Sequence, residues 1–98
     1  MMEFLVHQTN RMPSDEASLR LREELRIIER KRAQELRDAG ILIRLWRVPG
    51  TRDAIGLYRA EDATALHDAL SSLPLFPWLE ISVQPLATHP QEQALRQQ

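Results

Sequence analysis

Two kinds of hydrophobic spacing alternate along this chain, and their order restricts the folds that it can adopt. Bulky side chains fill four short segments, as in β-strands, and recur at every third or fourth residue in two others, as in helices. One of the four strand-like segments, 41–48, is apolar on both faces apart from Arg44 and Arg47. The predicted elements are strand 4–9, helix 15–39, strands 41–48 and 54–59, helix 63–72, and strand 79–83.

Residues that typically begin or end helices occur at the boundaries of the predicted helices. Ser14 is placed to cap the first helix and Gly40 to end it, while Asp62 can cap the second. Pro49 and Gly50 mark a tight turn between the two central strands. The order strand–helix–strand–strand–helix–strand predicts a ferredoxin-like α+β plait, with one antiparallel sheet and two helices on one face.

The faces of these elements predict which surfaces are buried. In the first strand, Phe4 and Val6 share one face, and Leu5 and His7 share the other. The face away from the helices would carry Leu5, Leu42 and Trp46, and so apolar a second face predicts burial against another subunit. The expected inward stripe of the long helix consists of Leu21, Leu25, Ile28 and Leu36.

The segment 73–78 is apolar but contains two prolines, so it is predicted to be a loop rather than a helix or a central strand. We expect the last strand to end before Pro85, followed by a polar tail over 87–98. The whole chain, 1–98, is expected to form one domain, because its 98 residues match the size of a small domain.

Composition excludes several kinds of function. The formal charge of −1 gives no general attraction for nucleic acid. The chain has no cysteine, which excludes disulfides and thiolate chemistry, and it shows no metal-ligand spacing and no phosphate-binding glycine loop. No apolar run is long enough for a membrane span, and the start of the chain does not resemble a signal peptide. We therefore expect a cytoplasmic protein without nucleic-acid or membrane partners.

Two residues could serve as a general base. His7 lies within a strand and can titrate near neutral pH, although histidines at such positions are more often hydrogen-bonded or interface residues. Glu29 and Arg32 lie on the same side of the long helix as Leu25 and Leu36. This pair could be a desolvated base with a cationic neighbour, or a salt bridge at the edge of the stripe.

Arginines and aromatic residues could form the rest of a site. Arg44, Arg47 or Arg52 could hold a substrate carboxylate through two hydrogen bonds, although most such arginines are solvated. Aromatic residues could line a pocket or simply belong to a core or an interface; these are Trp46, Phe76 and Trp78. We expect His67 to be a surface residue.

Several segments together resemble one family. They are 44–50 (RLWRVPG), 65–70 (ALHDAL), 73–78 (LPLFPW), 83–86 (VQPL) and His89-Pro90, with the opening 2–6 (MEFLV). In this order and spacing they are similar to the muconolactone Δ-isomerases. The resemblance implies a ferredoxin-like subunit in a ring-like homo-oligomer, typically a decamer. It also implies a cofactor-free and metal-free shift of the double bond of (+)-muconolactone, a lactone carboxylate, to 3-oxoadipate enol-lactone in aromatic catabolism through the β-ketoadipate pathway.

That reaction needs a base, a cation for the substrate carboxylate and an apolar wall. We take His7 as the first candidate for the base and Glu29 as the second. The candidates for the substrate-binding cation are Arg32, Arg44 and Arg47, and those for the wall are Trp46, Phe76 and Trp78. The alternative functions are a cofactor-free oxygenase of the dimeric α+β barrel group and a non-catalytic binding paralogue, because one fold serves many functions.

Overall fold

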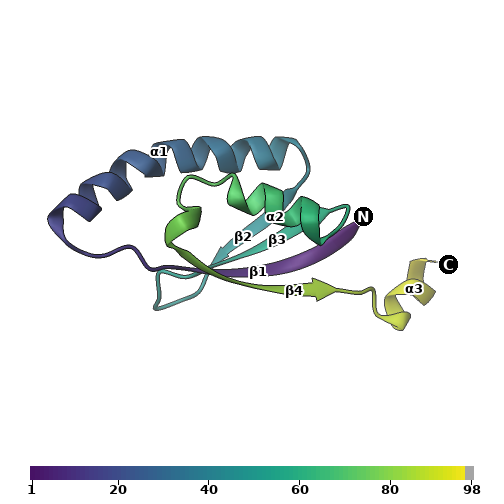
Figure 1. Cartoon of the computed structure of the whole chain (residues 1–98). Helices are drawn as coiled ribbons and strands as arrows, with labels where there is room; N and C mark the ends of the chain where they lie inside the picture. Colours follow the sequence, from purple (N-terminus) through teal and green to yellow (C-terminus); the bar gives the residue numbers. More distant parts are fainter. Residues whose placement is uncertain (97–98) are drawn as a thin grey trace.

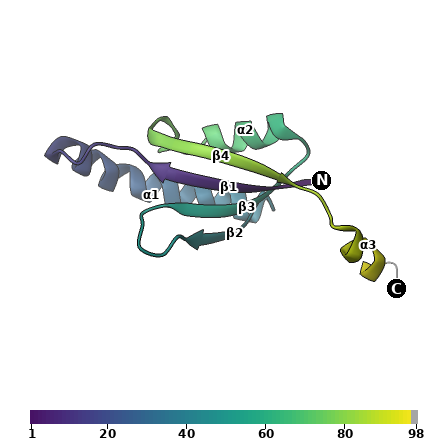
Figure 2. The same ribbon diagram turned by 90° about the horizontal axis from the view of Figure 1, so that it is seen from below.

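The computed structural model describes residues 1–96, and the last two residues of the predicted tail, 97 and 98, lie outside the described residues. In chain order the elements are β1 (Met2–Asn10), α1 (Glu16–Asp38), β2 (Leu42–Arg47), β3 (Ala54–Ala60), α2 (Ala63–Ser71), the 3₁₀ helix η1 (Phe76–Trp78), β4 (Leu79–Leu86) and α3 (Pro90–Arg96). The strands form one antiparallel sheet in the order β2-β3-β1-β4. Both long helices lie on one face of this sheet (Figures 1 and 2). The predicted α+β plait is thus confirmed.

The core lies between that face of the sheet and the two helices. Phe4 and Val6 of β1 are fully buried there, on one shared face as predicted, whereas Leu5 is half-buried and His7 is exposed on the other face. Leu36 of α1 and Leu66 and Leu70 of α2 close the core from the helix side. Asp62 caps α2 as predicted, since its carboxylate accepts a hydrogen bond from the Ala65 N–H at 2.8 Å.

The opposite face of the sheet, which we call the open face, carries Leu5, His7, Trp46, Ile55 and Leu57. Leu42 was expected among them, but it is only 3% exposed and pairs with Tyr58 in the core. The reason is a register shift between Leu42 and Arg44, a bulge that reverses the alternation of β2 and turns Leu42 toward the helices.

The inward side of α1 also differs from the prediction. Leu25 and Leu36 face the sheet as expected, but Leu21 and Ile28 are exposed. The half-buried line runs instead through Ser18, Arg22, Leu25, Glu29, Arg32 and Leu36, and the first turns of α1 extend past the end of the sheet (Figure 1). Because no sheet lies beneath those turns, polar residues are tolerated there on the inward side.

The helix cap is also one residue later than predicted. Asp15, rather than Ser14, is the cap residue, and its carboxylate accepts a hydrogen bond from the Ser18 N–H at 3.1 Å. A carboxylate at this position satisfies a free helix N–H and interacts favourably with the helix dipole.

The C-terminal third holds three further differences. The apolar loop 73–78 contains the short helix η1, which accommodates Pro77 because a proline is tolerated in the first turn. Strand β4 continues past Pro85 to Leu86, and an edge strand can include a residue that lacks an N–H. The polar tail contains helix α3, which begins at Pro90 and projects away from the sheet (Figures 1 and 2).

Candidate active site

Glu29 belongs to α1, and its side chain contacts the apolar loop 73–78. Its side chain is half-buried, and its Oε2 atom accepts a hydrogen bond from the backbone N–H of Leu75 at 3.0 Å. Burial raises the pKa of the Glu29 carboxyl above its ordinary value of 4.5, and the Leu75 hydrogen bond offsets part of this rise. A carboxylate in such surroundings is a stronger base than one in water.

Arg32 lies one helical turn from Glu29 but forms its hydrogen bonds elsewhere. Its Nε donates to the Ser72 hydroxyl at 2.8 Å, and its Nη1 lies 3.2 Å from a Glu35 carboxylate oxygen. A cation paired with Glu29 would lower the pKa of its carboxyl. The structure shows no such pairing, because the Arg32 guanidinium is directed to Ser72, just after α2, and to Glu35.

Tyr58 is a residue of this region that the sequence analysis missed. It lies on the covered face of β3, paired with Phe4 and Leu42, and is 2% exposed. Burial, together with the negative charge of Glu29, raises the pKa of Tyr58 to about 12. The available signal was the alternation of β3, which places Tyr58 on the same face as Gly56 and Ala60.

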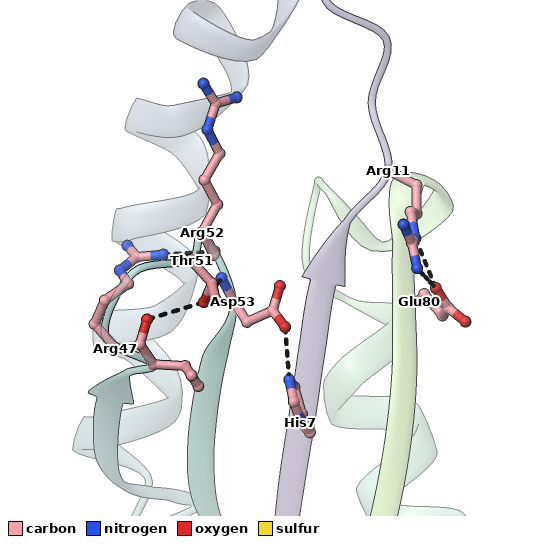
Figure 3. Close-up of polar contacts among 8 residues, drawn as sticks. His7, Arg11, Arg47, Thr51, Arg52, Asp53 and Glu80 are labelled. Carbon is pink, nitrogen blue, oxygen red and sulfur yellow. Dashed lines mark hydrogen bonds and ion pairs between the residues drawn. The ribbon is translucent and has the colours of Figure 1, made fainter.

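His7 lies on the open face, where its Nε2 is 2.9 Å from Oδ2 of Asp53 (Figure 3). The His7 side chain is 46% exposed. The hydrogen bond from His7 is the main reason that the pKa of Asp53 lies below its ordinary value of 3.8. The turn after β2 fixes Asp53, since the Asp53 N–H donates to the Thr51 hydroxyl and the Asp53 carbonyl accepts from the Val48 N–H.

Strand β2 carries Arg44, Trp46 and Arg47, and Arg52 lies in the turn that follows it. The Arg44 guanidinium lies 5.3 Å from the centre of the Trp46 ring, a cation–π contact on the open face. Arg47 donates to the carbonyl of Arg52 at 2.7 Å and so braces the turn (Figure 3).

Phe76 and Trp78 lie in η1, directly after Leu75. Phe76 is half-buried, and its ring meets that of His67 edge-on with 6.0 Å between the ring centres. The exposed His67, expected on the surface, and Phe76 also line an open apolar pocket of about 370 Å³ between α2 and β4. The Trp78 carbonyl accepts a hydrogen bond from the Arg11 N–H at 2.8 Å.

The structure thus separates the predicted site residues into two groups. Glu29, Arg32 and Phe76 lie on the covered side of the sheet, whereas His7, Arg44 and Trp46 lie on the open face. Within one subunit, the sheet therefore lies between His7 and Glu29. Among the described residues, 1–96, no group of three or more histidine, aspartate or glutamate side chains is placed to hold a metal ion.

Comparison with known proteins shows to which family the chain belongs. The family model of muconolactone delta-isomerase matches residues 2–92. The chain belongs to the muconolactone delta-isomerase family. A relative in Acinetobacter lwoffii, Muconolactone Delta-isomerase 2, is 36% identical over 91 residues, covering 90% of this chain and 91% of its own. Muconolactone Delta-isomerase of Pseudomonas aeruginosa is 36% identical over 89 residues, covering 91% and 92% of the two chains.

The fold agrees with a solved member of the family. A crystal structure of muconolactone isomerase superposes with a TM-score of 0.82 at 35% identity, covering 91% of this chain and 92% of that one. No helix in the described part of the chain is both long and apolar enough to cross a membrane.

Proposed function

We propose that this chain is a muconolactone delta-isomerase, which moves the ring double bond of (+)-muconolactone by proton transfer. The observation that carries the proposal is Glu29, a half-buried carboxylate of raised pKa beside the loop 73–78, in a chain of this family. A general base works best when its pKa lies near the working pH, and burial raises the pKa of Glu29 in that direction.

We assign the base to Glu29 rather than to our first candidate, His7. His7 is half exposed on the open face and is hydrogen-bonded to Asp53, whereas Glu29 lies in a partly desolvated position. Removal of water strengthens the electrostatic interactions on which proton transfer depends. The carboxylate would take a proton from a ring carbon of the lactone, and the resulting carboxylic acid would return it to another carbon.

Residues around Glu29 supply the other parts that the reaction needs. Arg32 follows Glu29 on the same side of α1, and its guanidinium, paired with the exposed Glu35, is free to exchange this partner for a substrate carboxylate. Phe76 and Trp78 follow Leu75 and would form the apolar wall. We leave Arg44, Arg47 and Trp46 outside this site, since their contacts lie on the open face or in the turn after β2.

The test is an ultraviolet assay of the purified protein with (+)-muconolactone, coupled to the hydrolase that consumes the enol-lactone. Glu29→Gln should lower kcat by on the order of 10²–10⁴, as expected for loss of a general base. His7→Ala and Glu24→Gln, an exposed control on the same helix, should retain the parent rate. If His7→Ala inactivates the enzyme and Glu29→Gln does not, the two assignments reverse. Oxygen consumption with aromatic substrates and no isomerisation would favour the oxygenase alternative.

We also propose that the protein is a cytoplasmic homo-oligomer, with a decamer expected from the family resemblance. Two features support association: the apolar side chains of the open face and the projecting segment 87–96, whose described side chains are exposed. Light scattering at micromolar concentration should give a mass above that of a dimer. A truncation after Leu86 should reduce that mass, and a monomeric full-length chain would refute association.

A further inference from the structure

Two side-chain hydrogen bonds join one turn of α1 to the short segment 72–75. The Oε2 atom of Glu29 accepts from the Leu75 N–H at 3.0 Å, and the Nε atom of Arg32 donates to the Ser72 hydroxyl at 2.8 Å. Residues three apart on a helix are neighbours on its surface. The candidate base and a guanidinium therefore lie side by side and contact the same four-residue segment.

The Ser72 hydroxyl is itself held in place. It donates to the carbonyl of Ala69 at 2.6 Å, and its oxygen accepts from Arg32. Ser72 is the C-cap residue of α2, and its N–H donates to the carbonyls of Asp68 and Ala69. The next residue, Leu73, is 4% exposed and belongs to the core. The hydroxyl thus offers Arg32 an acceptor at a defined position.

This contact determines which atoms of the Arg32 guanidinium remain for a ligand. A guanidinium binds a carboxylate best through two parallel N–H groups. Because Nε is bonded to Ser72, the pair that remains is formed by Nη1 and Nη2. Nη1 now lies 3.2 Å from a carboxylate oxygen of Glu35, whose side chain is 51% exposed. Such an exposed ion pair contributes little to stability, and Arg32 is 34% exposed, so a carboxylate ligand can reach the guanidinium and displace Glu35.

We propose that Ser72 is a positioning residue of the isomerase site. Its hydroxyl holds Arg32 so that Nη1 and Nη2 receive the carboxylate of the lactone, and Glu35 occupies that place when no substrate is bound. This inference rests on the proposed function. The ring and the carboxylate of a small lactone lie only a few bonds apart, so a cation one helical turn from Glu29 can hold the substrate while the base reaches a ring carbon. No bond forms or breaks at Arg32 or Ser72, and their effect is on binding and orientation.

Substrates with and without a negative charge test this role. Ser72→Ala should raise KM for (+)-muconolactone by about tenfold, as expected for loss of a hydrogen bond to a charged group. The kcat value should stay close to that of the parent, because the carboxylate is bound equally in the ground state and the transition state. The kcat/KM for the methyl ester of the substrate, low in the parent, should not fall further. An unchanged KM for the acid, or an equal loss for acid and ester, would overturn the proposal.

Two further variants of this segment serve as controls. Ser72→Thr keeps the hydroxyl and should retain the parent KM. Ser71→Ala removes a neighbouring hydroxyl that donates to the Asp68 carbonyl at 3.2 Å, and it should also retain the parent KM. A rise in KM for Ser71→Ala as large as that for Ser72→Ala would assign the effect to the end of α2 in general and overturn the role of the Ser72 hydroxyl.

Double-mutant cycles test whether Ser72 and Glu35 act through Arg32. Arg32→Leu should raise KM for muconolactone by on the order of 10², and Ser72→Ala should add nothing in that background. Glu35→Gln should lower KM, because it removes the competing carboxylate, and this gain should also vanish in the Arg32→Leu background. A Ser72→Ala loss that is equal in both backgrounds would overturn the positioning role. A Glu35→Gln gain that persists without Arg32 would overturn the exchange of partners.

Binding without turnover separates this inference from the proposed function. Because Glu29→Gln should react slowly, calorimetry with (+)-muconolactone can measure Kd for this variant. Adding Ser72→Ala should raise that Kd by the same factor as KM, whereas adding Ser71→Ala should not. A chain that isomerises muconolactone but binds it equally well without the Ser72 hydroxyl would overturn the inference and retain the function. A chain whose binding depends on Ser72 but that does not isomerise muconolactone would refute the proposed function and retain the positioning of Arg32.

Discussion

The pKa values of two carboxyl groups, one on each side of the sheet, are shifted in opposite directions. On the covered face, Glu29 is half-buried, and burial raises the pKa of its carboxyl. On the open face, Asp53 receives a hydrogen bond from His7, and the pKa of its carboxyl is lowered. The chain thus keeps one carboxyl in surroundings that disfavour its charge and another in surroundings that favour it.

This difference separates a group suited to proton transfer from one suited to structure. A carboxylate that the fold stabilises is a weak base, and the hydrogen bond of Asp53 joins β1 to the turn before β3. A carboxylate that the fold destabilises is more basic, and the fold loses stability in holding it. We therefore expect substitutions on the two faces to differ in size and, for the two carboxyls, in sign.

The largest expected effect on stability comes from the core of the covered face. Phe4 is 1% exposed, and Phe4→Ala should lower the free energy of unfolding by about 3–5 kcal/mol. Leu5→Ala, the neighbouring change on the open face, should cost less in a dissociated subunit and should weaken association. Denaturant unfolding at two protein concentrations distinguishes these effects, since only association makes the midpoint concentration-dependent. Equal losses for both variants, independent of concentration, would contradict the distinction between the faces.

Removal of the charge at Glu29 should stabilise the protein while inactivating it. The raised folded-state pKa means that the native state binds more protons than the unfolded state between the two pKa values, so stability falls as the pH rises through that range. Glu29→Gln should therefore raise the melting temperature at neutral pH. The gain should disappear below the ordinary pKa of glutamate, where both states are protonated. A lower melting temperature at neutral pH would show that the Leu75 hydrogen bond outweighs desolvation.

The order of elements could be predicted because each one is specified locally. Alternating residues in β1, the cap Asp62 and the turn at Pro49-Gly50 depend only on their neighbours in the chain. The face of Leu42 could not be predicted, because a bulge depends on how β2 pairs with β3. The helix that begins at Pro90 was likewise missed, since polar residues with a proline are equally typical of a loop.

The site was harder to predict than the fold for a similar reason. The sequence placed Glu29 and Arg32 on the inward side of α1, and the structure agrees. It gave no information on the partners of Arg32, because Ser72 lies far away in the chain. It likewise gave no information on the partner of Glu29, because the Leu75 N–H lies 46 residues further along the chain and is brought to the carboxylate only by the packing of α1 beside the loop 73–78.

The smallest expected effect is that of Asp53→Asn on the open face. The lowered folded-state pKa of Asp53 gives stability above the ordinary value of 3.8, and this stability is lost as the pH falls through the folded-state value. Asp53→Asn should therefore lower the melting temperature slightly at neutral pH, opposite in sign to Glu29→Gln, with Asp68→Asn on α2 as an exposed control. Salt should reduce the difference, because exposed ion pairs are screened. If Asp53→Asn instead impairs catalysis as strongly as Glu29→Gln, the open face takes part in the reaction, and the base must be sought at His7.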